Sequence, residues 1–255
     1  MGEQGATPAA PAWGGGVRAR TAGLGPRAFA GLRLVVRLGA VDRVAWAAAM
    51  GWSHATAYDH AIRLENAGLV GRQLTHSRSL LVATVEGAVA GGREDLGRGL
   101  ARGASTWAHA AAVSWVAGAM EHEAARWLSE RELRLEEAFW RLWLTGDDGG
   151  RRARRSSHFP DLGVVTNRRR AVAYEVELQS KRKARVKGLL DAYKKRLTSA
   201  SDELDELVYV VDSPRVAKLV STTAQEVGLT KGIVICPLDE LIERARSKPA
   251  AKNGG

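Results

Sequence analysis

The apolar positions near the N-terminus follow helical spacing. They recur every three or four residues over 27–38 and again over 41–50, which predicts two helices. A third helix is expected to start at Ser53, because serine commonly caps a helix N-terminus. It should end at Gly68, since glycine readily takes the left-handed conformation that closes a helix.

A pair of short strands should follow these helices. Apolar and β-branched residues over 69–74 and 79–85 flank a polar turn, which is the pattern of a hairpin. Three helices and a hairpin are the outline of a winged helix-turn-helix, so residues 26–92 are predicted to form a winged-helix domain that binds DNA. Residues 1–25 are rich in Gly, Ala and Pro and lack periodicity, which predicts a disordered arm.

Residues 93–145 are predicted to form a helical connector. Helical spacing extends over 106–126, and an aromatic-rich segment follows at 136–144. Residues 125–133 fit either the start of a strand or a continued helix. The tryptophans of this region fall at helical spacings and are expected in an interdomain core, with a base-stacking platform as the alternative: Trp107, Trp115, Trp127, Trp140 and Trp143.

The segment 146–246 alternates between strand and helix patterns. A predicted hairpin opens it, and helices and strands then alternate, which favours a mixed sheet. The predicted strands are 158–166, 171–179, 207–211 and 232–237, and the predicted helices are 184–198, 214–227 and 238–246. We therefore expect an α+β and α/β chain, with a winged helix before a mixed-sheet domain at 146–246 and a disordered tail at 247–255.

The strand predicted at 171–179 carries two acidic residues. Its alternation puts Glu175 and Glu177 on one face, about 6.5–7 Å apart along the strand. The opposite face is apolar and consists of Val172, Tyr174, Val176 and Leu178. Two carboxylates so placed repel each other, and a divalent cation between them removes that cost.

Hairpin pairing is expected to bring Asp161 beside Glu177. Asp161, Glu175 and Glu177 would then offer oxygen ligands of the kind that suit Mg²⁺ or Mn²⁺, with Lys181 just past the strand end. Such an ion activates water and stabilises charge on a phosphodiester. The alternative is a solvated strand face whose acids pair with Arg and Lys.

Two histidines lie near these acids in the sequence. His158 is expected to be a hydrogen-bonded structural residue, with a metal neighbour or general base as the alternative. His109, on the long alanine-rich helix, is expected to be a core histidine rather than a ligand.

Positive charge is concentrated around the acidic hairpin. The chain has a formal net charge of +10, and residues 151–200 alone exceed it. A basic block of this density predicts a polyanion partner, in particular DNA. The expected phosphate contacts are Arg151, Arg152, Arg154, Arg155, Arg168, Arg169, Lys183, Arg185 and Lys187.

The run SHATAYDHAIRLENAGLVGR resembles the recognition helix and wing entry of bacterial winged-helix domains. Ala57, Ala61, Leu64 and Leu69 match the core positions of those domains. The resemblance implies that the polar positions of this helix contact DNA, namely His54, Thr56, Asp59, His60 and Arg63. The alternative is that this unit forms a homodimer or contacts another protein.

The hairpin resembles the PD-(D/E)XK nuclease superfamily. Pro160-Asp161 matches the Pro-Asp signature, and Glu177-Leu178-Gln179 matches a variant in which Gln replaces the motif lysine. The resemblance implies that residues 146–246 form a restriction-endonuclease-like domain with a catalytic set of Asp161, Glu177, Gln179 and Lys181. It also implies a helical acid before the hairpin, either Glu121 or Glu123.

A narrower resemblance covers about residues 30–215. The winged helix, the His-bearing helix, WLSERELR, HFPD and VAYEVELQSK together resemble the replication-relaxation family of plasmids and integrative elements. The resemblance implies a DNA-binding protein that acts in replication or transfer of its element. Together with the nuclease resemblance, it leads us to expect a cytoplasmic protein that nicks DNA with Mg²⁺ or Mn²⁺. The alternative is a DNA-binding regulator whose nuclease-like domain is inert.

The composition argues against several other classes of protein. The single cysteine, Cys236, excludes a disulfide framework and any multi-cysteine metal site. The N-terminal residues lack the basic and apolar regions of a secretory signal. Gly103–Met120 lacks charge but is rich in Ala and carries polar residues, so we expect a buried helix and no membrane partner.

Overall fold

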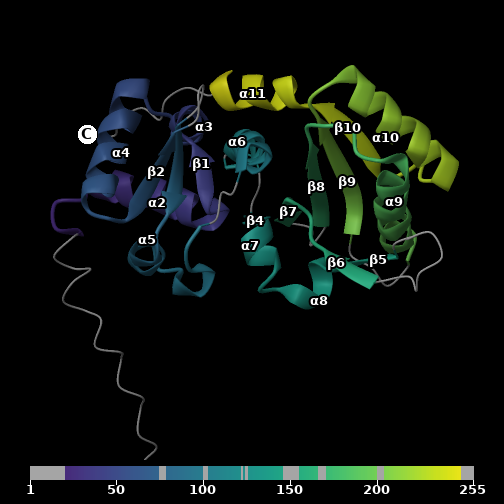
Figure 1. Cartoon of the computed structure of the whole chain (residues 1–255), viewed down its shortest axis with the longest axis horizontal. Coiled ribbons are helices and arrows are strands. Elements are labelled where there is room, and N and C mark those ends of the chain that lie inside the picture. Colours follow the sequence, from purple (N-terminus) through teal and green to yellow (C-terminus); the bar gives the residue numbers. More distant parts are fainter. Residues whose placement is uncertain are drawn as a thin grey trace, which may run out of the picture.

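The computed structural model describes residues 21–74, 79–99, 103–121, 123, 126–145, 155–165, 171–199 and 204–247. The chain combines helices with mixed sheets (Figure 1). Its N-terminal unit consists of α2 (Pro26–Leu38), β1 (Ala40–Asp42), α3 (Arg43–Ala49), α4 (His54–Asn66), β2 (Val70–Leu74) and β3 (Ser79–Ala83). The strands form an antiparallel sheet in the order β1-β3-β2.

Local sequence explains where these helices begin and end. Ser53 caps α4, because its hydroxyl accepts a hydrogen bond from the Thr56 N–H at 3.1 Å. Gly68 has a φ of 69° just after α4, so both predicted boundaries are confirmed. The predicted helix at 41–50 starts later, because Asp42 ends β1 and caps α3. A three-residue strand is too short to leave an alternating pattern.

The predicted helical connector at 93–145 is helical only in part, and the strand considered at the start of 125–133 is present. The region starts with η1 (Glu94–Leu96) and α6 (Gly103–Met120), but it also contains β4 (Arg126–Ser129) and β5 (Leu142–Thr145). β4 is the edge strand of the main sheet, paired antiparallel with β7 (Leu162–Val165). After it come the short helices α7 (Glu130–Leu133) and α8 (Glu137–Trp140).

The main sheet has the strand order β10-β9-β8-β7-β4. β8 (Ala171–Glu177), β9 (Leu204–Val211) and β10 (Ile233–Pro237) run parallel, whereas β7 and β4 pair antiparallel. β6 (Arg155–His158) pairs with β5 in a separate ribbon. The helices are α5 (Val85–Ala90), α9 (Lys183–Leu197), α10 (Pro214–Val227) and α11 (Leu238–Ser247).

Helices cover both faces of this sheet. In Figure 1, α9 and α10 lie on one side of β8 and β9, while α6 lies on the other side and α11 crosses the top. Val176 packs in the core that includes α6, and Tyr193 packs in the core beneath α9. Glu175 and Glu177 point into the second layer and are only 4% and 5% exposed. The alternative that Glu175 and Glu177 lie on a solvated strand face is therefore wrong.

The N-terminal unit shares its core with the main sheet. Trp46 of α3, Trp115 of α6 and Val176 of β8 belong to one cluster of buried residues. α6 is the common element, since it contacts α3, β1, β8 and α11. No helix in the described part of the chain is long and apolar enough to cross a membrane.

Candidate functional site

Asp161 takes part in the hairpin ladder with both its backbone and its side chain. Its N–H donates to the Tyr174 carbonyl at 3.0 Å, and its Oδ2 accepts from the Val176 N–H at 2.7 Å. These two bonds lie on either side of Glu175. Asp161 is therefore opposite Glu175, not Glu177 as the predicted register had it.

His109 of α6 reaches Asp161 across the sheet end. Its Nε2 lies 2.8 Å from Asp161 Oδ1, and the His109 side chain is 39% exposed. Burial favours the neutral ring, but the hydrogen bond and charge of Asp161 outweigh it and raise the pKa of His109. The expectation of a core histidine is therefore wrong.

The Glu175 carboxylate is buried and has two hydrogen-bond partners. Its Oε1 lies 2.7 Å from His158 Nε2, and it accepts from the Tyr193 hydroxyl at 2.5 Å. Burial raises the pKa of Glu175, and the two hydrogen bonds only partly oppose it. The pKa of His158 is also raised, because the Glu175 carboxylate overcomes the effect of burial. His158 is thus the hydrogen-bonded residue that the sequence predicts.

Glu177 is paired with Lys181. Lys181 Nζ lies 2.5 Å from Glu177 Oε2, an atom that is buried and has no hydrogen bond of acceptable geometry. The charge of Lys181 also lowers the pKa of His109 against the effect of Asp161. The structure therefore brings Asp161, Glu177 and Lys181 to the same end of β8.

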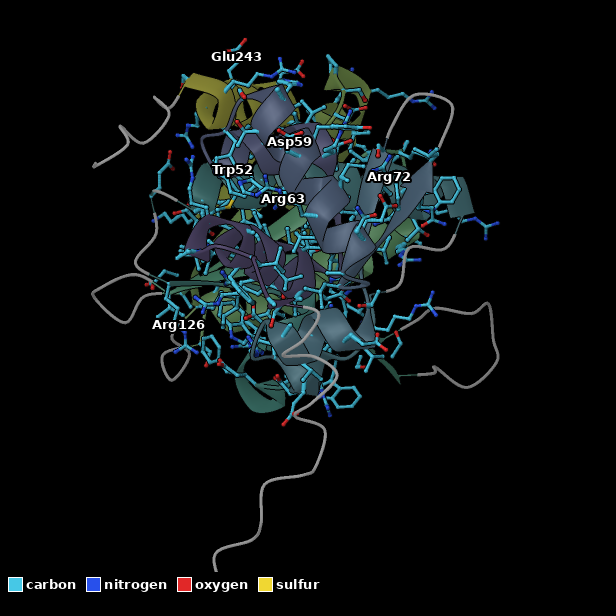
Figure 2. All side chains as sticks on the ribbon, turned by 90° about the vertical axis from the view of Figure 1, so that its left-hand side faces the viewer. Trp52, Asp59, Arg63, Arg72, Arg126 and Glu243 are labelled. Carbon is cyan, nitrogen blue, oxygen red and sulfur yellow. The ribbon has the colours of Figure 1, made fainter. Side chains whose placement is uncertain are left out.

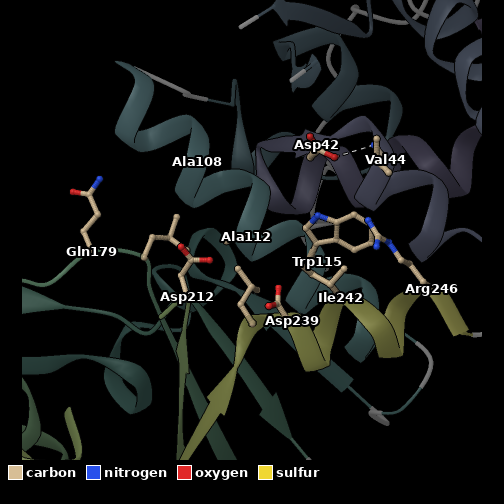
Figure 3. A pocket seen from close by; sticks show the side chains of 12 residues that line it. Asp42, Val44, Ala108, Ala112, Trp115, Gln179, Asp212, Asp239, Ile242 and Arg246 are labelled. Carbon is tan, nitrogen blue, oxygen red and sulfur yellow. Dashed lines mark hydrogen bonds between the residues drawn. The ribbon is translucent and has the colours of Figure 1, made fainter. Parts of the chain in front are cut away.

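Gln179 is placed differently from these three residues. It lines a cavity of about 600 Å³ between α6, α11 and the carboxyl ends of the parallel strands (Figure 3). Asp212 follows β9 and Asp239 lies in the first turn of α11, and both line the same cavity. Asp161 instead lines a smaller cavity of about 130 Å³ with His109 and Glu130. The implied catalytic role of Gln179 thus has no geometric link to Asp161.

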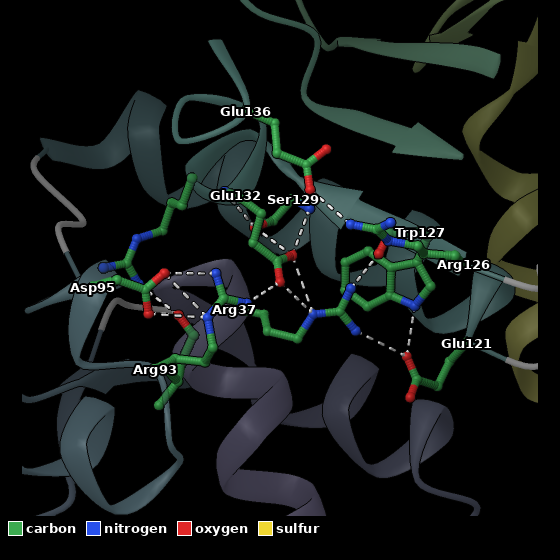
Figure 4. A network of polar contacts seen from close by, with 11 residues as sticks. Arg37, Arg93, Asp95, Glu121, Arg126, Trp127, Ser129, Glu132 and Glu136 are labelled. Carbon is green, nitrogen blue, oxygen red and sulfur yellow. Dashed lines mark hydrogen bonds and ion pairs between the residues drawn. The ribbon is translucent and has the colours of Figure 1, made fainter. Parts of the chain in front are cut away.

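The helical acid implied by the nuclease resemblance does not reach the cluster. Glu121 accepts a hydrogen bond from Trp127 Nε1 at 2.7 Å and lies 3.9 Å from Arg37 (Figure 4). Glu123 lies 3.9 Å from Arg244. Twelve residues separate His109 from Glu121, about 18 Å along a helix, so the two cannot share a small site.

Asp161 and Glu177 are the residues here that could hold Mg²⁺. Within the described ranges, no three His, Cys, Asp or Glu side chains are arranged as a ready ligand set. Mg²⁺ typically binds one or two carboxylates, keeps several waters and takes further ligands from substrate phosphates. Glu177 Oε2 contacts the Lys181 ammonium, which a metal ion would replace, whereas Asp161 and Glu175 each already have two hydrogen-bond partners.

Basic side chains lie next to the cluster at the start of α9. Lys183, Arg185 and Lys187 are exposed, and Lys183 pairs with Glu226 at 2.5 Å. The other predicted phosphate contacts lie outside the described residues: Arg151, Arg152, Arg154, Arg168 and Arg169. Arg155 begins β6, and its side chain is not among those described.

The polar residues of α4 do not all face outward. His54, Asp59 and Arg63 are exposed, and Figure 2 shows Asp59 and Arg63 on the face toward the viewer. Thr56 is half-buried and its hydroxyl contacts Ser53. His60 packs on the Trp52 ring with centroids 4.5 Å apart, and burial lowers its pKa. The ring of His60 is half-buried and keeps part of its surface open, so its contact with DNA stays a prediction.

Sequence analysis missed an aromatic residue on this surface. Tyr58 of α4 is 45% exposed, with the Arg43 guanidinium 5.2 Å and the Arg72 guanidinium 5.8 Å from its ring centroid. Arg43 comes from α3 and Arg72 from β2, so three elements meet here. Tyr58 lies one residue before Asp59, and its helical position opposite the core was the signal.

Comparison with family models, curated proteins and solved structures found no match for this chain.

Proposed function

We propose that this chain is a DNA-binding protein of a plasmid or integrative element, acting in its replication or transfer, and that it nicks DNA with Mg²⁺ or Mn²⁺. The observation that carries the proposal is the buried Glu177 carboxylate, which pairs with Lys181 at the strand end where Asp161 also lies. An acid, a second acid and a cation at one strand end form the set required for phosphodiester cleavage.

The order of elements in the N-terminal unit supports a winged helix. A helix, a short strand, two helices and a hairpin follow one another, and the strands pair in the order β1-β3-β2. In such domains the second helix of the helix-turn-helix enters the major groove, and here that helix is α4. Its exposed residues His54, Asp59 and Arg63 are the proposed base-edge contacts.

The arrangement of β7, β8 and α9 supports a nuclease-like unit. Asp161 precedes the first strand of a hairpin, Glu177 ends the second, and a helix and a parallel strand follow. This is the order that the PD-(D/E)XK resemblance implies. The mobile-element context rests on the replication-relaxation resemblance alone.

Each residue of the cluster has a definable task. Asp161 and Glu177 would hold the ion, which supplies an activated water and offsets charge on the phosphate. Lys181 Nζ would donate to a non-bridging phosphate oxygen, once the phosphate displaces it from Glu177. Lys183, Arg185 and Lys187 would contact phosphates farther along the strand, so binding should weaken steeply with salt.

A second function is favoured by the contacts already made in the site. Asp161 is bonded to His109 and the Val176 N–H, and Glu175 to His158 and Tyr193. An inert nuclease-like domain would also have acidic side chains whose hydrogen-bond partners come from the protein itself. The second candidate is therefore a DNA-binding regulator or replication accessory protein without cleavage.

A plasmid-nicking assay separates the two functions. Supercoiled plasmid is incubated with full-length protein and Mg²⁺ or Mn²⁺, and open-circle product is measured for wild type, Glu177→Gln and Glu243→Gln. Glu243 is an exposed acid on α11 and is the matched control. We expect Glu177→Gln to lower the rate about 100-fold or more and Glu243→Gln to leave it unchanged.

Three other outcomes overturn the proposal in different ways. Equal nicking by wild type and Glu177→Gln would show that this site does not cleave. No nicking by wild type, with retained binding to a labelled duplex, would establish the accessory function instead. Absence of any DNA binding by a protein with intact circular dichroism would exclude both functions.

A further inference from the structure

Trp143 lies on the surface rather than in the predicted interdomain core. Its side chain sits on β5 and is 53% exposed, whereas Trp115, Trp127 and Trp140 are at most 5% exposed. Tryptophan is highly buried on average, so an exposed ring leaves on the order of 100 Å² of aromatic surface without a partner. An exposed ring of this size is a candidate contact for a ligand.

The β5–β6 ribbon explains why Trp143 faces solvent. Trp143 pairs with Ser157, which is also exposed, and the adjacent pair is Leu142 with His158. Leu142 is 3% exposed and packs in the core beneath α9. Because successive side chains alternate, the ribbon buries Leu142 and must present Trp143 outward.

Arginine and aromatic side chains alternate from Trp143 toward the acidic cluster. The Arg141 guanidinium lies 5.5 Å from the Trp143 ring centroid and 5.8 Å from that of Phe159. The Arg134 guanidinium lies 5.0 Å from the same Phe159 ring. Phe159 precedes Asp161 by two residues. The series therefore links the exposed ring to the proposed site of cleavage, and its cations favour an anionic occupant.

We propose that Trp143 is a stacking platform for a base of single-stranded DNA. An open aromatic ring next to guanidinium groups is the combination that binds unpaired nucleic acid, where bases stack on rings and phosphates meet cations. Bases within a duplex have both faces covered by their neighbours, so the ring selects an unpaired strand. The inference rests on the proposed function for the identity of the polymer, and it deepens that function by naming unpaired DNA as the substrate at this site.

The side chains from Trp143 to Arg134 indicate where a bound DNA strand would run. A strand whose base stacks on Trp143 can place its phosphates beside Arg141 and Arg134 and continue toward Asp161. Arg134 also pairs with Glu130, which lines the cavity of Asp161 and His109. The duplex-binding surface of α4 belongs to a different unit, so the two DNA forms have separate contacts.

Fluorescence anisotropy with metal chelated tests the inference without cleavage. Full-length protein is titrated into a labelled mixed-sequence single strand and into its duplex. We expect Trp143→Ala to weaken single-strand binding about 5- to 100-fold, since one stacked base contributes about 1–3 kcal/mol, and to leave duplex binding unchanged. Trp143→Phe should retain most of the affinity because it keeps a ring. The matched control is Leu135→Ala, an equally exposed apolar residue outside the series.

The outcomes separate this inference from the proposed function. Wild-type binding to duplex, with single-strand affinity unaffected by Trp143→Ala, overturns the inference alone. A change in oligomeric state on size-exclusion chromatography without a change in single-strand affinity would assign Trp143 to a protein interface, which also overturns it. A wild-type protein that binds neither DNA form overturns the proposed function and the inference together.

Discussion

Lys181 Nζ lies 2.5 Å from Glu177 Oε2, so a partly exposed cation covers a carboxylate whose side chain is only 6% exposed. Lys181 belongs to the segment between the end of β8 and the start of α9. The pair therefore fixes the chain where it leaves the sheet. A ligand that binds Glu177 or Lys181 in place of its present partner must also compensate the charge of the side chain that it displaces.

Removing only the cation should destabilise the fold. We expect Lys181→Ala to lower the free energy of unfolding by about 1–3 kcal/mol, because the Glu177 carboxylate stays buried without a compensating charge. Glu177→Gln combined with Lys181→Ala should lie closer to wild type than the sum of the single changes. Urea unfolding of the four proteins measures this coupling, and strictly additive changes would show that the two groups do not interact.

Stability should fall as the pH rises above neutrality. The pKa of His109 and the pKa of His158 are both raised above the ordinary value of about 6.5. A raised pKa means that the folded state binds the proton more tightly, so this stabilisation is complete below about pH 6.5 and is lost as the pH passes the folded-state pKa. The urea midpoint should therefore decrease as the pH rises above about 6.5.

Single histidine variants identify the groups that cause this pH dependence. His109→Gln and His158→Gln should each flatten the decrease, because glutamine keeps a hydrogen-bond donor but has no proton to lose. His54→Gln is the matched control, since His54 is exposed on α4. An undiminished slope in the double variant His109→Gln/His158→Gln would show that other groups dominate.

Sequence patterns predicted the elements whose ends are determined locally. Ser53 and Gly68 bound α4 as expected, and α10 occupies the predicted residues 214–227. Caps and glycine turns depend on residues within a few positions of each other, and these interactions are visible in a single sequence.

Elements and contacts that depend on distant residues were left undecided or missed. β4 is a strand because it pairs with β7, more than 30 residues later, and its four residues carry no alternation of their own. The His109–Asp161 contact joins residues 52 positions apart, and only the packing of α6 across the sheet end creates it. The acids of the candidate site were found from strand period, but their register and partners depended on such tertiary contacts.

Glu132 should be a major anchor between the N-terminal unit and the main sheet. This buried carboxylate accepts from Arg37 Nε at 3.1 Å and pairs with Arg93, while the Arg37 guanidinium stacks 3.5 Å from the Trp127 ring centroid (Figure 4). Glu132→Ala leaves two arginines without their shared acid, so we expect a loss of about 3 kcal/mol in the free energy of unfolding. Thermal unfolding measures it.

Asp95→Asn is the matched control for Glu132. Asp95 also pairs with Arg93, but its side chain is 45% exposed, so its removal should cost under about 1 kcal/mol. Equal effects of Glu132→Ala and Asp95→Asn would contradict the anchoring role of the buried acid.

Arg43 and Arg72 should each contribute to the salt dependence of duplex binding. They flank the exposed Tyr58 ring from α3 and β2, and the Arg72 pair with Glu65 at 2.6 Å directs its guanidinium toward α4. If α4 lies in the major groove, as proposed, these arginines lie where the two backbones pass. Each phosphate contact releases counterions, so Arg43→Gln and Arg72→Gln should each reduce the slope of log K against log salt by about 0.9.

Anisotropy titrations on a duplex at several salt concentrations measure the slopes. Arg126→Gln is the control, because Arg126 is exposed on β4 and away from this surface (Figure 2), and it should leave the slope unchanged. Equal slopes for wild type, Arg43→Gln and Arg72→Gln would place the DNA on a different face of the N-terminal unit.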